Sequence, residues 1–148
     1  MSLNTHVAAR AATAAPALSA RTRRVSLAVL VLIVAEFVLG MYVNLYVTVP
    51  RADHAHGSGN VLSNGPATLS IHAVLGLLLA LAAIGVLVLA IRTRRAAAIV
   101  FSAAGLLAIA LAAMAGASFA SSGRAADSMA MSVLTGVALL CYAANLYQ

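Results

Sequence analysis

The sequence predicts an all-α protein whose four helices form a bundle across a lipid bilayer. The first observation is composition: of 148 residues, 64% are hydrophobic and 8% are charged, and the mean hydropathy is +1.04. An average soluble domain carries about 25% charged residues, so this chain lacks the polar surface that a water-soluble fold needs. The second observation is four long apolar runs, and the third is the gathering of charge at the ends of those runs.

The four apolar runs are each long enough for one membrane-spanning helix. A helix needs about 20 apolar residues to cross roughly 30 Å of hydrocarbon, and backbone groups in lipid must find hydrogen bonds within their own segment. We therefore expect one membrane domain over residues 25–148, with residues 1–24 forming a flexible cytoplasmic tail. The expected spans are residues 25–49, 69–91, 96–118 and 128–147.

The placement of arginine predicts the orientation of these helices. Seven of the nine basic residues fall in the N-terminal tail and in the short loop after residue 91, whereas Arg51 and Arg124 fall in the other two loops. Because cytoplasmic loops carry the excess of Lys and Arg, we expect both termini to be cytoplasmic and the protein to cross the plasma membrane. The arginines lie at helix ends and not along a soluble face, so the expected partner is the bilayer and not nucleic acid.

A histidine in the second run is the most informative polar residue. His72 lies one turn inside the start of this run, and Gly76, Ala80 and Ala83 continue below it as a stripe of small residues. Polar side chains inside a bilayer are costly unless they find partners, so their positions carry information. The small residues leave room either for a flat cofactor against the helix or for close helix packing, with His72 hydrogen-bonded to a loop carbonyl. Both interpretations stay open at this point.

Glu36 and Asn44 are the polar residues of the first run. Glu36 falls near mid-membrane, and at ~1.5 Å per residue Asn44 lies about 12 Å further out, level with His72. A carboxyl group at this depth must face the bundle interior or stay protonated. It is therefore either a proton-carrying or ligand-contacting group, or a neutral acid bonded to a hydroxyl group of another helix.

Sulfur and imidazole groups on the outer side supply weaker candidates. Met129 and Met131 lie in the first turns of the fourth run, at about the depth of His72. Methionines at such positions are more often packing residues than ligands. His54 and His56, in the loop after the first run, are a weak signal for a divalent metal.

Small residues recur along the third run. Ala104, Ala108, Ala112, Gly116 and Ala120 are spaced four residues apart. This spacing predicts a close seam between helices. It also offers a surface through which two copies of the chain would form a homodimer.

Four short motifs together resemble one four-helix half of the heme A synthase family. The first run ends Val38-Leu-Gly-Met-Tyr-Val-Asn-Leu-Tyr-Val-Thr-Val-Pro50, the second continues His72-Ala-Val-Leu-Gly-Leu-Leu-Leu-Ala, the third ends Met114-Ala-Gly-Ala-Ser-Phe, and the fourth begins Met129-Ala-Met-Ser. The resemblance covers about residues 25–147. Members of the family bind heme between the second and fourth helices of each half. The resemblance therefore implies that His72 is an axial heme ligand and that Gly40 matches the glycine-bearing first helix.

Three departures from the family pattern change the implied function. Leu69 stands three residues before His72, where the family has a glutamate tied to its oxidation chemistry. The fourth-helix histidine is missing, with Met129 or Met131 near its place, and the paired loop cysteines of many members are absent because the chain has one cysteine. These departures argue against heme A synthesis and leave heme b as the implied cofactor. Met131 is the expected sixth ligand, with a loop histidine as the alternative, and His/Met ligation raises the reduction potential.

The expected role is electron transfer or heme or redox sensing, with no enzymatic reaction that the residues identify. Arg51 or Arg124 would pair with heme propionates, and a redox protein or membrane complex would be the partner. Two alternatives stay open. In the first, the protein is a non-enzymatic accessory or assembly subunit in which His72, Asn44 and Glu36 join helices. In the second, it is a small proton-linked transporter that uses Glu36.

Overall fold

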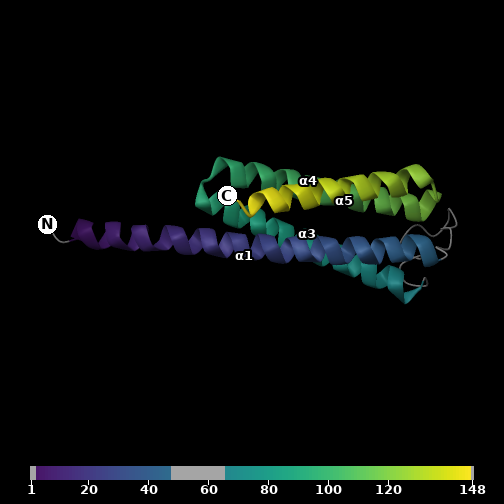
Figure 1. The fold of residues 1–148 in the computed structure, drawn as a ribbon, viewed down its shortest axis with the longest axis horizontal. Helices are drawn as coiled ribbons and strands as arrows, with labels where there is room; N and C mark the ends of the chain where they lie inside the picture. The colour runs from purple at the N-terminus through teal and green to yellow at the C-terminus, as the bar shows by residue number, and fades with distance from the viewer. Residues whose placement is uncertain (1–2, 48–65, 148) are drawn as a thin grey trace.

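The structure is a computed structural model that describes residues 3–47 and 66–147, and these residues form long helices, the last three of which are joined by short turns (Figure 1). No strand occurs in the described residues, so the all-α prediction is confirmed for them. The helices begin and end close to the predicted limits, except that the first helix reaches back through the segment expected to be a tail. They are α1 (Leu3–Tyr46), α3 (Ala67–Thr93), α4 (Ala96–Ser122) and α5 (Ala125–Asn145).

Each helix contains a segment long and apolar enough to cross a membrane. These segments are Ala20–Tyr46, Ala67–Thr93, Ala96–Ser122 and Ala125–Asn145. Large apolar side chains point outward along all four helices, including Val31, Leu77, Leu107 and Leu140. Exposed apolar surface on this scale is unfavourable in water and favourable in lipid, so the chain is built as a multi-pass membrane protein.

The helices form a closed ring in which each helix has two neighbours. α1 packs against α3 and α5, and α4 packs against the same two helices, so α3 and α5 face each other diagonally across the bundle. Figure 1 shows α1 projecting past the bundle at the end that holds the α3–α4 turn and the last residues of α5. We call this the arginine end, and the end that holds the α4–α5 turn the opposite end. Alanine and arginine, which dominate residues 3–24, are strong helix formers.

Two tight turns reverse the chain at the two ends, and both use a left-handed residue. Arg94 has φ 55° at the end of α3, and its N–H donates to the carbonyl of Ile91. Gly123 has φ 65° at the end of α4, and its N–H donates to the carbonyl of Phe119. Glycine adopts this conformation without strain, whereas a residue with a Cβ pays roughly 1 kcal/mol. The arginine end therefore carries a strained residue where the opposite end has a glycine.

The hydrophobic core lies toward the arginine end of the bundle. Tyr142 of α5 is fully buried there, and its ring lies against Gly105 of α4, where an added Cβ would come within 2.7 Å of Cε2. Of the small residues predicted to form a seam on α4, Ala108 and Ala112 are buried inside the bundle and Ala104 is exposed, and homodimerisation stays a prediction. The buried core residues are Val29, Ile33, Leu79, Ala83, Val86, Ala108, Ile109, Ala138 and Tyr142.

A buried polar cluster joins three helices beside this core. The amide Nδ2 of Asn145 donates to the hydroxyl of Ser102 at 2.9 Å and to the hydroxyl of Ser26 at 3.3 Å. All three residues are almost completely buried. The cluster therefore links α1, α4 and α5 with bonds that water does not reach.

Replacing Asn145 with alanine should lower the free energy of unfolding by about 1–2 kcal/mol, because interhelical hydrogen bonds in membranes contribute about 0.6 kcal/mol each, at most about 1.7. Chemical denaturation in detergent measures the change. The matched control is Asn44→Ala, because Asn44 is exposed and accepts one hydrogen bond from Ser128 at 3.2 Å. An equal loss of unfolding free energy in the two variants would show that burial of the Asn145 cluster adds nothing to stability.

Candidate functional site

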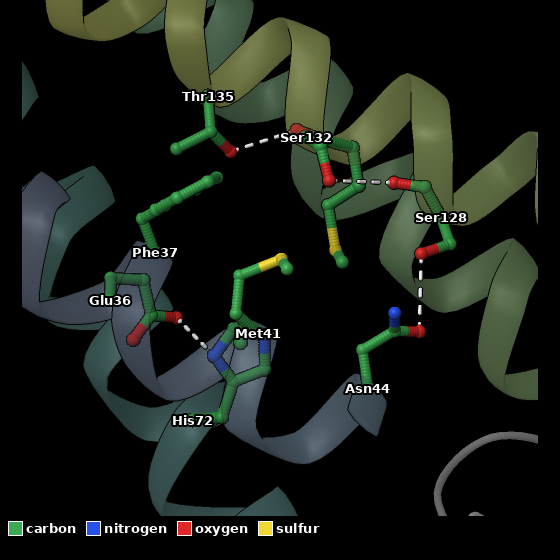
Figure 2. A pocket seen from close by; sticks show the side chains of 10 residues that line it. Glu36, Phe37, Met41, Asn44, His72, Ser128, Ser132 and Thr135 are labelled. Atoms are coloured by element: carbon green, nitrogen blue, oxygen red, sulfur yellow. Dashed lines mark hydrogen bonds and ion pairs between the residues drawn. The ribbon is translucent and has the colours of Figure 1, made fainter.

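A cavity lined by polar and apolar side chains lies between α1, α3 and α5, on the side of the core away from the arginine end. Its volume is about 40 Å³, and Figure 2 shows the side chains that surround it. A single water molecule needs about 10–15 Å³ on this measure, so the cavity has room for two or three waters. Its lining residues are Glu36, Phe37, Gly40, Met41, Asn44, His72, Ser128, Met131, Ser132 and Thr135.

Glu36 and His72 meet across the contact between α1 and α3. The Oε1 atom of Glu36 lies 2.9 Å from Nδ1 of His72, and the two side chains are 11% and 22% exposed. The ring N–H does not point along the line to this oxygen, so the two groups are in close polar contact without an aligned hydrogen bond. The second oxygen of Glu36, Oε2, is buried and has no partner among the described residues.

Two glycines make room for this pair. An added Cβ at Gly40 of α1 would lie 3.0 Å from Cε1 of His72, and an added Cβ at Gly76 of α3 would lie 3.1 Å from Oε1 of Glu36. Each helix therefore supplies one ionisable residue and, four residues later, a glycine that accommodates the partner's side chain. The antiparallel register brings both glycines into place, because Glu36 faces Gly76 where His72 faces Gly40.

The wall contributed by α5 is polar, but its hydroxyl groups already have hydrogen-bond acceptors. Ser132 donates to the carbonyl of Ser128 at 3.1 Å, and Thr135 donates to the carbonyl of Met131 at 2.8 Å. Ser128 itself donates to Oδ1 of Asn44 on α1. The lone pairs of these oxygens remain available to a ligand, whereas their protons are engaged.

Two methionines line the cavity, and they are not the pair that the sequence suggested. Met131 lies in its wall, with its sulfur against Gly116 of α4, where an added Cβ would lie 3.2 Å from Sδ. Met41 of α1 also lines the cavity, and Figure 2 shows its side chain beside His72. Met129 is 70% exposed and is not among the lining residues.

The remaining candidates lie elsewhere. Arg124 is bound by Asp127 through contacts of 3.1 Å at the opposite end of the bundle, and this hydrogen-bonded carboxylate raises the pKa of the guanidinium. Arg51, His54 and His56 lie outside the described residues. Within residues 3–47 and 66–147, no group of three or more His, Cys, Asp or Glu side chains is placed to hold a metal ion.

Sequence reasoning identified Glu36, Gly40, Asn44, His72 and Met131 but missed Phe37 and Met41. A helical signal for both was present, because Phe37 and Met41 are four residues apart and form a stripe beside that of Glu36, Gly40 and Asn44.

The lining of this cavity includes side chains that can bind heme iron, but the cavity is too small to hold a heme. An imidazole and two thioethers are recognised iron ligands, whereas sites for molecules the size of a drug or cofactor measure about 300–1,000 Å³. Binding of a porphyrin therefore requires α1 and α3 to move apart from α5. Comparison of this chain with protein-family models, curated proteins and solved structures finds no match.

Proposed function

We propose that this protein is a heme-b-binding membrane protein that serves electron transfer or heme or redox sensing. One observation carries the proposal: the Glu36 carboxylate lies beside Nδ1 of His72 while the imidazole borders the cavity. Histidines that bind metals usually direct their second ring nitrogen at a carboxylate or carbonyl, which sets the tautomer and leaves the other nitrogen as ligand. In this arrangement Nε2 of His72 is the ligand for iron.

Heme supplies one-electron chemistry when bound, and the protein supplies ligands and surroundings. Met131 is the proposed sixth ligand, and Met41 is a second thioether on the same cavity. Because Arg124 already binds Asp127, a propionate would have to compete for it. The diagonal between α3 and α5 is the proposed place for the porphyrin, since these helices do not pack against each other.

The proposed orientation places the arginine end in the cytoplasm of a cell whose plasma membrane holds the bundle. This end carries Arg21, Arg23 and Arg24 on α1 and Arg92, Arg94 and Arg95 around the α3–α4 turn. In the described residues, the opposite end carries one arginine, Arg124, neutralised by Asp127. The arginine excess therefore supports cytoplasmic termini.

An absorbance spectrum of the purified protein tests the proposal. The wild-type protein, purified or titrated with hemin, should show a Soret band and sharpened visible bands after reduction with dithionite. His72→Ala should lose these bands, because Nε2 is the proposed ligand. Met131→Leu should retain bound heme but shift the reduced bands and lower the reduction potential. Met129→Leu is the matched control, because Met129 faces outward.

Two results would contradict the proposal. One is a wild-type protein that stays colourless and does not change the spectrum of added hemin. The other is a His72→Ala variant that binds hemin as the wild type does.

A second candidate function is favoured by the pairing of polar groups across the helices. Glu36 lies against His72 and Asn44 accepts from Ser128, so polar contacts join α1 to α3 and α5 around a cavity of about 40 Å³. In a non-enzymatic accessory subunit without cofactor, these contacts would serve only to hold the helices together. It predicts a colourless protein that copurifies with a membrane complex.

A further inference from the structure

Six arginines gather around one end of the bundle. Arg21, Arg23 and Arg24 lie on α1, and Arg92, Arg94 and Arg95 lie at the α3–α4 turn; all six are exposed. The two groups are level with each other, because the antiparallel register that sets Gly40 against His72 and Gly76 against Glu36, continued along α1 and α3, sets Thr22 opposite Ala90. No acidic residue lies at this end in the described part of the chain: Glu36 lines the cavity and Asp127 lies at the opposite end.

Apolar side chains become exposed immediately below these arginines. Leu27 on α1 is 50% exposed one turn after Arg23, and Ile91 on α3 is 53% exposed directly before Arg92. Tyr147 is 88% exposed at the same end. Tyrosine and arginine at the limit of an apolar surface mark the level of lipid headgroups, so the six guanidinium groups lie at the depth of phospholipid phosphates.

One of these arginines occupies a position that stability alone would give to glycine. Arg94 ends α3 in the left-handed conformation with φ 55°, and the corresponding residue at the end of α4 is Gly123 with φ 65°. A residue held in a strained conformation is grounds for asking what its side chain does. At this site the strain places one more exposed guanidinium group among the other five.

We propose that the arginine end binds the anionic headgroups of phospholipids such as phosphatidylglycerol. Guanidinium groups bind phosphate oxygens through paired hydrogen bonds, and the exposed apolar faces beneath them receive the acyl chains. A free phosphate ion would use the arginines but not these apolar faces, so the structure favours the lipid. The proposal does not depend on heme binding, since the cavity lies on the far side of the core.

Lipid titration of the full chain in neutral detergent tests the proposal. Near physiological ionic strength, wild-type protein should bind phosphatidylglycerol in preference to phosphatidylcholine, measured by the thermal unfolding midpoint and by lipids retained in native mass spectrometry. Each arginine near an anionic surface contributes about fivefold in affinity. Replacing Arg92 and Arg94 with glutamine should therefore weaken phosphatidylglycerol binding by about 25-fold. Arg124→Gln, at the opposite end, should leave it unchanged.

Arg94→Gly separates lipid binding from folding. Because glycine relieves the left-handed strain, this variant should be at least as stable as the wild type in neutral detergent, yet bind phosphatidylglycerol about fivefold more weakly. Three results would overturn the proposal: unchanged lipid binding in the Arg92/Arg94 variant, an equal loss in Arg124→Gln, or stabilisation by inorganic phosphate equal to that by the lipid.

Discussion

His72→Ala is expected to lower the free energy of unfolding by about 3 kcal/mol even when no cofactor is bound. Removing the imidazole leaves the buried carboxylate of Glu36 without its polar contact, and a buried charged group left unsatisfied costs about 3 kcal/mol or more. The lower end of this range applies because the His72 side chain is 22% exposed. Loss of the imidazole would leave both oxygens of Glu36 without a partner, since Oε2 already has none. Denaturant unfolding of the cofactor-free protein in detergent measures this change.

A double-mutant cycle with Glu36→Gln attributes the loss to the pair. In the Glu36→Gln background the amide is neutral, so removal of His72 should cost about 1 kcal/mol, the order of one neutral hydrogen bond. The coupling between the two residues should then reach about 2 kcal/mol. Additive effects of the two substitutions would mean that the contact between Glu36 and His72 contributes nothing to stability.

Gly105→Ala is expected to destabilise the bundle by about 1–2 kcal/mol, because the cost of overpacking exceeds the gain in helix propensity. The added Cβ would lie 2.7 Å from Cε2 and 3.2 Å from Cζ of Tyr142, so the ring must move. Tyr142 is fully buried in the core, where a shift of the ring displaces its neighbours, and overpacking of this kind costs about 1–3 kcal/mol. The thermal or denaturant unfolding midpoint reports the effect.

The matched control is Gly136→Ala on α5. An added Cβ at Gly136 meets nothing within 4 Å, so only the gain in helix propensity of up to about 1 kcal/mol remains. The two variants should therefore change stability in opposite directions. A Gly105→Ala protein as stable as the control would contradict the close contact between α4 and Tyr142.

The four spans could be predicted from the sequence because length and apolar composition are local properties. The separation of Glu36 and Asn44 along α1 could also be predicted, since each helical residue advances a known distance. His72 was expected level with Asn44, about 12 Å from Glu36, but the structure places it opposite Gly40 and in contact with Glu36. The rotation of these residues about the bundle axis could not be predicted, because it depends on which helices become neighbours. As a result, Glu36 was expected to bond a hydroxyl group of another helix or a ligand, whereas the structure pairs it with His72.

The spacing of two glycines was a sequence signal for the contact between Glu36 and His72. Gly40 follows Glu36 by four residues, and Gly76 follows His72 by four residues. In two antiparallel helices this shared spacing allows each side chain to lie against the other helix's glycine. The Asn145 cluster gave no comparable signal, because a lone asparagine or serine near the end of a span is also common at the membrane surface.

The protonation of the two ring nitrogens of His72 decides whether Nε2 can bind iron. Nitrogen NMR of protein labelled in its histidines, assigned with His72→Ala, distinguishes a protonated Nδ1 from a protonated Nε2. Because Nδ1 faces the carboxylate of Glu36, we predict that the cofactor-free protein carries the proton on Nδ1 and leaves Nε2 free of a proton. A ring with its proton on Nε2 would contradict the account, because that nitrogen would have no lone pair to offer to iron.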